Sequence, residues 1–219
     1  MYTVCMDTMK EGKETGRLEA FSDGVFSVAI TLLVLNIKIP AADASPIQLL
    51  GEGPMLLAYV TSFATIGVMW INHHRLFTYI KRTDTVLLLL NLLLLAIIVF
   101  IPVPTAFLAD AINKFLDGAD YPTAALVYSA TFFLMATCFN VLWFYASYKG
   151  RLLDTKADPR AVQAISRQYR FGPLFYVLIF AVAWFNMLAC IILTLISTLF
   201  FAMPVRLPPT ASEKGEISH

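Results

Sequence analysis

The sequence predicts an all-α integral membrane protein with six transmembrane helices in each chain, because its composition and its pattern agree. Of the 219 residues, 58% are hydrophobic and only 14% are charged, and the mean hydropathy is +0.71. Soluble domains carry a charge on roughly a quarter of their residues. The apolar residues also fall into blocks close to the ~20 residues that a helix needs to cross a bilayer. We expect one transmembrane domain over residues 1–205 and a short C-terminal tail over residues 206–219.

Prolines and short polar segments separate the first four apolar blocks. The predicted spans cover about residues 20–39, 55–77, 85–104 and 122–148. The first span stops at Pro40, and the third is an almost unbroken run of Leu and Ile up to Pro102 and Pro104. The fourth begins at Pro122, and a proline is tolerated in the first turn of a helix because the N–H that it lacks would have no partner there.

The last apolar block is too long for one span. Residues 171–203 carry no charge at all, and a single helix of this length would measure about 50 Å. The block is therefore predicted to be two spans, at about 168–184 and 187–203, with a turn near Trp184 to Asn186. An aromatic ring and an amide suit the membrane interface at such a turn. The preceding residues, 149–170, are predicted to be a polar loop.

Lys and Arg are distributed unevenly along this topology. Of the 16 Lys and Arg residues, only Lys38 and Lys114 fall on the side opposite to the others when six spans are drawn. Cytoplasmic segments carry an excess of Lys and Arg, so both termini are expected in the cytoplasm of a multi-pass protein of the cell membrane. A single span after residue 170 would place Arg206 and Lys214 outside, which also favours two spans there.

The first apolar block is not expected to be a cleaved signal peptide. Ala42-Asp43-Ala44 imitates the small-residue cleavage pattern. Acidic residues precede the block, however, and Asp23 interrupts it, whereas a signal peptide has a basic first region and an uninterrupted apolar one.

Charge balance, cysteine content and motifs exclude several classes of function. The net charge is +1, from 16 basic and 15 acidic residues, and gives no electrostatic case for a nucleic-acid partner. Cys5, Cys138 and Cys190 are too few and too scattered for a zinc site or a disulfide framework. No G-x-S-x-G, H-E-x-x-H or glycine-rich phosphate loop occurs. We therefore expect no enzyme and no bound metal.

The first span is the most polar of the six. Its polar and small residues are Ser22, Asp23, Gly24, Ser27, Thr31 and Asn36. A carboxylate this close to hydrocarbon is costly unless it is paired or faces a wet cavity, so Asp23 is a candidate functional residue. Its expected partners are Arg17, if the chain bends before Phe21, or the basic residues at the inner end of the second span, His73, His74 and Arg75.

A second pattern in the first span is a stripe along one helix face. Gly24, Val28, Thr31 and Leu35 follow one another at spacings of four, three and four residues. If the stripe faces an aqueous path, Val28 and Leu35 form narrow apolar collars and Thr31 supplies a hydroxyl between them. The alternative is that these residues let helices approach closely, as in small-xxx-small packing.

Three motifs in the first half of the chain resemble those of one family. Arg17-Leu-Glu-Ala-Phe-Ser-Asp23 fits the R-x-x-x-F-S-D signature that opens the first helix of the transmembrane protein 175 family, the bacterial and lysosomal potassium channels. Trp70-Ile-Asn-His-His-Arg-Leu-Phe77 is similar to the tryptophan and histidine motif of the family's second helix. Residues 91–105 are similar to the end of its third helix. The agreement in order and spacing covers residues 17–105.

The resemblance implies a homotetramer in which four first helices line a central pore. The family lacks the T-V-G-Y-G filter of ordinary potassium channels, and ions instead pass apolar side-chain constrictions and a layer of threonines. The matching positions here are Val28, Thr31 and Leu35, although Val28 is smaller than the Ile or Leu expected. The implied function is a cation channel with moderate selectivity for potassium over sodium. Potassium is then a permeant ion, and no cofactor is implied.

The resemblance also implies a network that holds the inner end of the first helix against the second without coordinating the ion. Its first-helix members are Arg17, Phe21, Ser22 and Asp23, and its second-helix members are Trp70 with His73 or His74.

Other interpretations of these residues are open. Adjacent helical residues point about 100° apart, so His73 and His74 do not easily chelate one metal ion, and hydrogen bonding or pH sensing is favoured. A proton-coupled secondary transporter would use Asp23 and a histidine as a relay. Against it, the second half shows neither a repeat of the Asp23 region nor a pair of broken helices. A non-conducting membrane scaffold is the third possibility.

Overall fold

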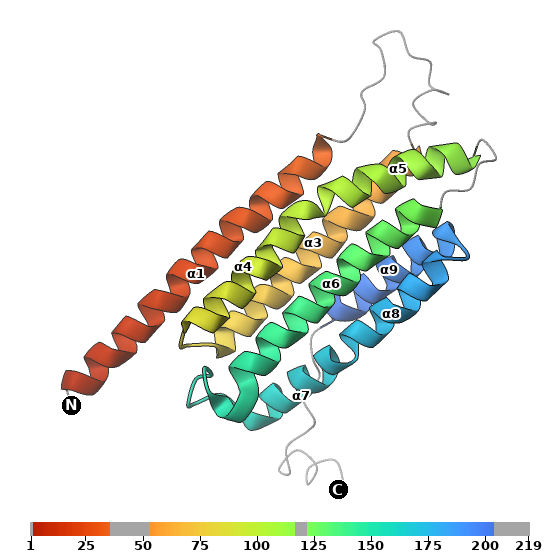
Figure 1. The fold of residues 1–219 in the computed structure, drawn as a ribbon. Helices are drawn as coiled ribbons and strands as arrows, with labels where there is room; N and C mark the ends of the chain where they lie inside the picture. Colours follow the sequence, from red (N-terminus) through yellow and green to blue (C-terminus); the bar gives the residue numbers. More distant parts are fainter. Residues whose placement is uncertain (1, 36–52, 117–121, 204–219) are drawn as a thin grey trace, which may run out of the picture.

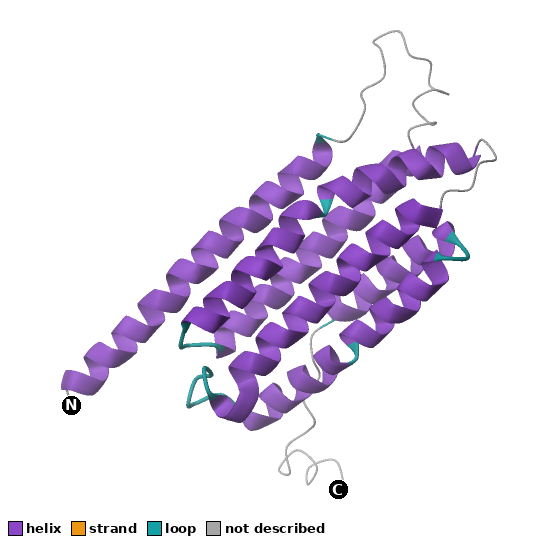
Figure 2. Cartoon of the chain, in the orientation of Figure 1, coloured by secondary structure: helices purple, strands orange, loops and turns teal. Residues whose placement is uncertain are grey.

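The computed structural model describes residues 2–35, 53–116 and 122–203, and it describes side chains in the first helix from Thr15 onward. Within these ranges the chain is almost entirely α-helical, and the helices lie side by side in one elongated bundle (Figures 1 and 2). The all-α prediction is confirmed. The predicted end of the first span at residue 39 and the tail over 206–219 lie outside the described residues.

Two long helices begin the bundle. Helix α1 (Tyr2–Val34) lies at one edge, and α3 (Gly53–Tyr79) packs against it. Helix α4 (Thr85–Phe100) is the other main neighbour of α1 (Figure 1). Asp84 caps the start of α4: its carboxylate accepts a hydrogen bond from the Leu87 amide at 2.9 Å and so satisfies an amide that has no partner within the helix.

The sequence suggested that the third span ends at its prolines, but the structure continues as a helix beyond them. Helix α5 (Pro102–Leu116) follows α4 after the single residue Ile101, which has helical backbone angles. Pro102 has no N–H to offer to the Ile98 carbonyl, and the Ile101 amide donates to that carbonyl instead, at 3.1 Å. The two helices therefore run as one bent rod beyond residue 104, because a proline at a first helical position does not stop the helix that it begins.

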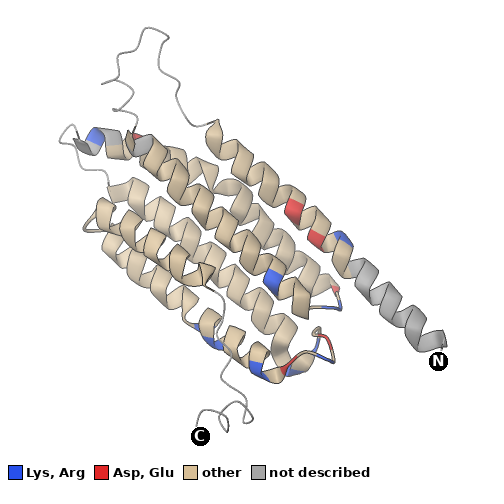
Figure 3. Cartoon of the chain, turned by 180° about the vertical axis from the view of Figure 1, so that it is seen from behind, with Lys and Arg blue, Asp and Glu red and all other residues tan. Residues whose placement is uncertain are grey.

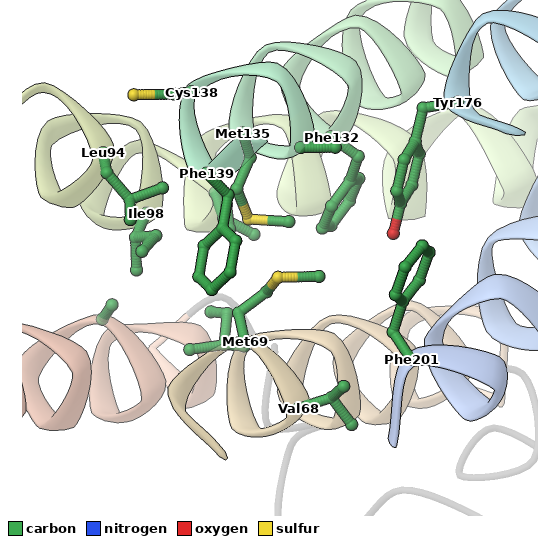
Figure 4. Close-up of a cluster of buried hydrophobic side chains, with 14 of the residues drawn as sticks. Val68, Met69, Leu94, Ile98, Phe132, Met135, Cys138, Phe139, Tyr176 and Phe201 are labelled. Carbon is green, nitrogen blue, oxygen red and sulfur yellow. The ribbon is translucent and has the colours of Figure 1, made fainter. Parts of the chain in front are cut away.

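Helix α6 (Pro122–Ser147) lies in the middle of the bundle. It packs against α4, α5 and two helices near the end of the chain, α8 (Gly172–Ala183) and α9 (Met187–Ala202). Its Trp143, Tyr128 and Phe132 are among the largest fully buried side chains. Met69 from α3 points toward Met135 and Phe139 from α6 (Figure 4). In a bilayer this kind of close packing, rather than the hydrophobic effect, holds helices together.

Hydroxyl groups add polar contacts between the buried helix faces. Ser62 of α3 lies 2.8 Å from the Thr105 hydroxyl of α5 and 3.2 Å from the Tyr128 hydroxyl of α6. Thr65 of α3 lies 2.9 Å from the Thr198 hydroxyl on the last helix. Hydrogen bonds between transmembrane helices contribute on the order of 0.6 kcal/mol each. Helix α3 is thus tied to three neighbours inside the bundle.

The segment predicted as one polar loop contains a helix. Helix α7 (Pro159–Arg170) is capped by Asp158, whose carboxylate accepts a hydrogen bond from the Arg160 amide at 2.9 Å. Its buried residues Ala161, Ile165 and Tyr169 recur every four positions. The prediction was wrong because this short amphipathic helix carries its charges on the opposite face, so composition alone resembled a loop. A 3-10 turn at Tyr148–Gly150 (η1) precedes it.

The last apolar block forms two helices. Helix α8 (Gly172–Ala183) continues the direction of α7 after a break at Phe171, and α9 (Met187–Ala202) returns along it. The turn occupies residues 184–186, where Trp184 and Phe185 are exposed. The Asn186 side chain accepts from the Ala189 amide at 2.9 Å and starts α9. Here an amide replaces the glycine or proline that would have marked the turn.

Grouped by continuity, the helices form six rods within the described ranges. The rods are α1, α3, α4 with α5, α6, α7 with α8, and α9. Three stretches are long and apolar enough to cross a bilayer by length and composition, namely Leu56–Tyr79, Thr85–Ile112 and Pro122–Gly150, and Met187–Ala202 is a shorter apolar helix. Most charged side chains lie at one end of the bundle (Figure 3). These features agree with a membrane protein whose ends face water.

Candidate functional site on the first helix

The two faces of α1 differ completely in burial. The residues that face the bundle are Ser22, Phe26, Ala29 and Leu33, each at most 1% exposed. The predicted stripe of Gly24, Val28, Thr31 and Leu35 is exposed, with Val28 at 52% and Leu35 at 75%. The two sets have the same spacing and are offset by two residues, or about 200° around the helix. The predicted stripe therefore points away from its own chain.

The sequence left open whether the stripe instead lets helices of the same chain approach one another closely. A Cβ added at Gly24 would meet no heavy atom within 4 Å in this chain. No helix of the described chain therefore uses Gly24 for a close approach. The stripe remains available to another copy of the chain, to water or to lipid.

Thr31 orients its hydroxyl through its own helix. Its Oγ1 donates a hydrogen bond to the Val28 carbonyl at 2.9 Å. A hydroxyl has one proton and two lone pairs, so with its proton turned back to the backbone the oxygen presents lone pairs to the outside. The arrangement suits contact with a cation.

A buried hydrogen-bonded chain joins α1, α3 and α4. Ser22 donates to the Leu18 carbonyl at 2.8 Å and accepts from the Asn91 amide nitrogen at 3.0 Å. The Asn91 oxygen lies 2.9 Å from Nε2 of His73. An amide oxygen only accepts, so Nε2 of His73 carries the proton. The imidazole also packs against the rings of Phe26 and Phe77, whose centroids lie 5.4 and 4.6 Å from its own.

Asn91 was not singled out as a site residue from the sequence, although it lies within the third family motif. The signal was present, because Asn91 is the one amide in the Leu- and Ile-rich run from 85 to 101. It is 1% exposed. A polar residue inside such a run is expected to have a partner on another helix.

Asp23 is bound by Trp70, which the family resemblance placed in the same network but which the residue pattern alone did not offer as its partner. The indole Nε1 of Trp70 donates to its carboxylate at 2.8 Å, at the exposed edge of the α1–α3 contact. The Trp70 ring lies nearly parallel to that of His74, with centroids 6.3 Å apart. The expected hydrogen bonds from Arg17, His73, His74 or Arg75 to Asp23 are not formed among the described residues. Trp70, rather than one of these basic residues, binds Asp23 because it lies opposite Asp23 at the contact between the two helices.

The remaining motif residues lie apart from these contacts. Arg17 is exposed and makes no hydrogen bond or ion pair within the part of the chain that the structure describes. Phe21 is 55% exposed. Arg75 turns away from α1 and donates to the Asn72 side chain at 3.3 Å. The predicted network therefore consists of a buried part around Ser22 and His73, an exposed part around Asp23 and Trp70, and two residues that extend outward.

His73 and His74 are not placed to bind one metal ion together. His73 is buried and His74 is exposed, so their rings lie in different surroundings. Across the described residues, no three His, Cys, Asp or Glu side chains come close enough together to hold a metal ion.

Comparison with known proteins identifies the family of the chain. Residues 17–102 match the family model described as endosomal/lysosomal potassium channel TMEM175. A protein of Chamaesiphon minutus named as a potassium channel is 44% identical over 88% of this chain and 96% of its own length. The chain belongs to the TMEM175 family. The suspected resemblance is confirmed.

Further similarities extend to structure and to animal proteins. The TMEM175 chain resembles the crystal structure of a lysosomal potassium-selective channel TMEM175 homolog from Chamaesiphon minutus, with a TM-score of 0.74, 41% identity and coverage of 87% of this chain and 97% of that one. The Bos taurus protein named endosomal/lysosomal proton channel TMEM175 is 44% identical over 39% of this chain and 20% of its own length.

Membership of the TMEM175 family decides the class of function. The family is one of ion channels, so the expectation that the chain is not an enzyme is confirmed. Ions are permeants of such proteins rather than cofactors. The family also confirms that the chain is a membrane protein.

Proposed function

We propose that this TMEM175 protein is a homotetrameric potassium channel of the cell membrane, moderately selective over sodium, whose pore is lined by α1 from four subunits. The observation that carries the proposal is the division of α1 into a fully buried face and an exposed stripe that contains Val28, Thr31 and Leu35. A helix at a subunit's edge with such a face is suited to line a shared axis. The naming of the Chamaesiphon minutus relative as a potassium channel supports the choice of ion.

Val28 and Leu35 are the proposed apolar collars. An apolar constriction impedes ions because water leaves it when it is narrow. Four Val28 side chains leave a wider opening around the axis than four Ile or Leu side chains would. The proposed collar at Val28 therefore gives a lower barrier to ion passage. Leu35 lies about two turns further along the stripe and forms a second collar.

Thr31 is the proposed oxygen layer between the collars. Four hydroxyl oxygens, each with its proton directed at the Val28 carbonyl, replace part of the hydration of a passing cation. A small number of oxygens with moderate field strength favours potassium, which is weakly hydrated, over sodium. The preference is modest because one layer offers fewer ligands than a stack of carbonyl cages.

The hydrogen-bonded residues around α1 are proposed to fix the rotation of the helix. Ser22, Asn91 and His73 bind α1 on its buried face, and Trp70 binds Asp23 at its edge. Rotating α1 would break these contacts and move the stripe off the axis. Arg17 and Phe21 point outward and are therefore available to a neighbouring subunit.

A proton-coupled transporter using Asp23 and a histidine is less well supported by the contacts. Asp23 is bound by Trp70, and His73 by Asn91. No hydrogen bond among the described residues joins Asp23 to either histidine. A relay through these groups would have to break both contacts.

The first test concerns the collar at Val28. Val28→Asn replaces an apolar group with an amide that water wets, so passive potassium flux through reconstituted liposomes is expected to rise several-fold. Val34→Asn is the matched control, because Val34 is exposed on the same helix about a quarter-turn from the stripe. Flux is measured as the voltage change of potassium-loaded vesicles.

Unchanged flux in a correctly folded Val28→Asn protein would place the pore elsewhere. Flux that required an opposing proton gradient would favour the transporter. An equal rise in Val34→Asn would mean that the substitution loosens the helix rather than widening a collar.

The second test concerns the oxygen layer. Thr31→Val keeps the shape of the side chain and removes the hydroxyl, so the permeability ratio of potassium to sodium is expected to fall by about twofold or more. The ratio is measured from reversal potentials under bi-ionic conditions. Ser27→Ala, which removes an exposed hydroxyl beside the stripe, is expected to leave it unchanged. A ratio unchanged in Thr31→Val would remove Thr31 from the selectivity mechanism.

A further inference from the structure

An apolar groove opens on the surface between α6 and α8, near the end of α6. Its volume is about 530 Å³, and its lining includes Val141, Phe144, Tyr145, Tyr148, Arg151 and Pro173. We call it the α6–α8 groove. Val141 and Phe144 are 47% and 40% exposed, so the groove wall is open to the surroundings of the protein. In a bilayer such a wall is in contact with lipid.

Two cations lie over tyrosine rings that line one end of this groove; Arg151 itself lines it, and Lys149 lies next to it. The Arg151 guanidinium lies over the Tyr145 ring at 5.0 Å, and the Lys149 ammonium lies over the Tyr148 ring at 5.3 Å. The Arg151 side chain is 56% exposed, and its one described ion pair is a 3.4 Å contact with Asp84. A guanidinium has five N–H donors. Arg151 therefore keeps donors free for a second anion.

The groove runs from a charged end beside Arg151 to apolar residues along α6. Its cations lie after the end of α6, at the end of the bundle where most Lys and Arg of the described chain gather (Figure 3). Tyrosine is enriched at membrane interfaces, and Tyr145 and Tyr148 lie beside these cations. From there Phe144 and Val141 continue along α6 toward the middle of the helix. The groove thus has a charged end at the interface and an apolar end in hydrocarbon.

The position of the groove in the bundle favours lipid over another subunit. Helix α1 packs mainly on α3 and α4, and α8 lies on the far side of α6 from them (Figure 1). This step rests on the proposed function, in which α1 faces the axis of the tetramer. The α6–α8 groove then lies at the periphery.

We propose that the α6–α8 groove binds one anionic phospholipid per subunit, with the phosphate held by Arg151 and Lys149 and an acyl chain along Val141 and Phe144. Arginine forms bidentate, charge-assisted hydrogen bonds with phosphate. The apolar lining accepts an acyl chain from any lipid, whereas the two cations select for net negative charge. The groove therefore prefers phosphatidylglycerol to phosphatidylcholine, by roughly fivefold or more.

The test measures lipids retained by the full-length protein released from detergent micelles in native mass spectrometry. Equal amounts of phosphatidylglycerol and phosphatidylcholine are added, and the wild type is expected to retain phosphatidylglycerol preferentially. Arg151→Gln is expected to reduce that preference at least several-fold, and Arg167→Gln, which changes an exposed arginine of α7 outside the groove, to keep it. Val141→Trp fills the groove and is expected to reduce retention of both lipids.

Two further variants separate binding from folding. Leu134→Trp places the same ring on the same face of α6, two turns away and outside the groove, and is expected to retain lipid. Asp84→Asn removes the carboxylate partner of Arg151 without removing the cation. If Arg151→Gln acts through the phosphate, Asp84→Asn keeps or strengthens the preference for phosphatidylglycerol.

Several outcomes would overturn the proposal. They are an equal retention of the two lipids by the wild type, an unchanged preference in Arg151→Gln, and a loss in Asp84→Asn equal to that in Arg151→Gln. A changed oligomeric mass of Val141→Trp would make the groove an interface between copies. Potassium flux through vesicles is measured separately, so a failure of lipid binding with normal flux refutes the groove and not the pore.

Discussion

At the residue scale, Asn91 joins three helices through one carboxamide. Its nitrogen donates to Ser22 of α1 and its oxygen accepts from His73 of α3, while its own backbone belongs to α4. All three side chains are at most 1% exposed. A buried polar group without a partner costs about 1–3 kcal/mol, so the three groups depend on one another.

Replacing Asn91 should destabilise the subunit more than replacing an exposed neighbour. Asn91→Leu keeps a similar volume but leaves Ser22 and His73 without their shared partner, and we expect a loss of about 1–3 kcal/mol. The measurement is the midpoint of thermal unfolding in detergent, followed by size-exclusion chromatography. Leu92→Ala, at a position 53% exposed, is the control and should change the midpoint little. Equal midpoints for the wild type and Asn91→Leu would show that the chain of hydrogen bonds contributes nothing.

At the element scale, two loops far apart in sequence form a clasp at the charged end of the bundle. We define the Asp84 clasp as residues 79–84 with 145–154. Backbone bonds join its halves, with the Lys81 amide donating to the Leu152 carbonyl at 2.9 Å and the Asp154 amide to the Tyr79 carbonyl at 2.8 Å. The Asp84 carboxylate accepts from the Tyr145 hydroxyl at 2.6 Å. The clasp fixes where α3 ends, where α4 begins and how the chain leaves α6.

The clasp makes stability depend on pH through Asp84. Partial burial raises the pKa of this carboxyl. The hydrogen bonds from Tyr145 and the Leu87 amide and the charge of Arg151 lower it, and together they outweigh the burial, so the pKa lies below its ordinary value of 3.8. A carboxylate with a depressed pKa stabilises the fold above its unfolded pKa, and this contribution is lost as the pH falls through the folded pKa. The stabilisation is therefore present at neutral pH, begins to decline near about pH 4 and is lost as the pH falls further through the folded pKa.

Tyr145→Phe tests this dependence by removing the hydroxyl that binds Asp84. At pH 7 we expect a midpoint of thermal unfolding lower by on the order of 2–4 °C, and we expect the difference from the wild type to shrink as the pH approaches 3. Tyr148→Phe is the matched control, because Tyr148 is 64% exposed and lies on the same segment. A difference of the same size at pH 7 and pH 3 would contradict a role for the Asp84 charge.

At the scale of the whole molecule, the described charges are asymmetric in the way that the sequence predicted. Basic residues occur in the loop after α3, in the segment after α6 and along α7. Lys114, at the far end of α5, is paired with Asp110 at 2.6 Å, which reduces the positive charge at that end. Under the positive-inside rule the charged end is cytoplasmic, and we propose this orientation.

Cross-linking tests whether the exposed stripe meets other copies of the chain. In a Cys5→Ser background, Val28→Cys is expected to form disulfide-linked dimers on mild oxidation, because four such residues approach one axis in the proposed tetramer. Ala29→Cys, at the adjacent position that is 0% exposed, should stay monomeric on a denaturing gel. The native Cys138 and Cys190 are buried. Cross-links at position 29 but not at 28 would reverse the proposed rotation of α1.

Several features followed from the sequence because they depend on short-range pattern. The apolar blocks predicted the membrane helices. Asn186 indicated the turn before α9, although no glycine or proline occurs there. The motif around Asp23 predicted the family. From the sequence, α7 was missed and the third span was ended too early, in each case because of the local sequence. Helix α7 has too few apolar residues to stand out, and the bend at Ile101 resembled an ending because two prolines follow it.

The sequence by itself determined that Gly24, Val28, Thr31 and Leu35 share one face of the first helix, and only the tertiary structure decided that this face is exposed and the opposite one buried. Helical periodicity fixes the angle between side chains on one helix but not the rotation of that helix against its neighbours. That rotation is set by contacts with other helices, here Ser22 with Asn91 and Asp23 with Trp70. For the same reason the sequence could give Asp23 several candidate partners, and only the packing of α1 on α3 selected the indole.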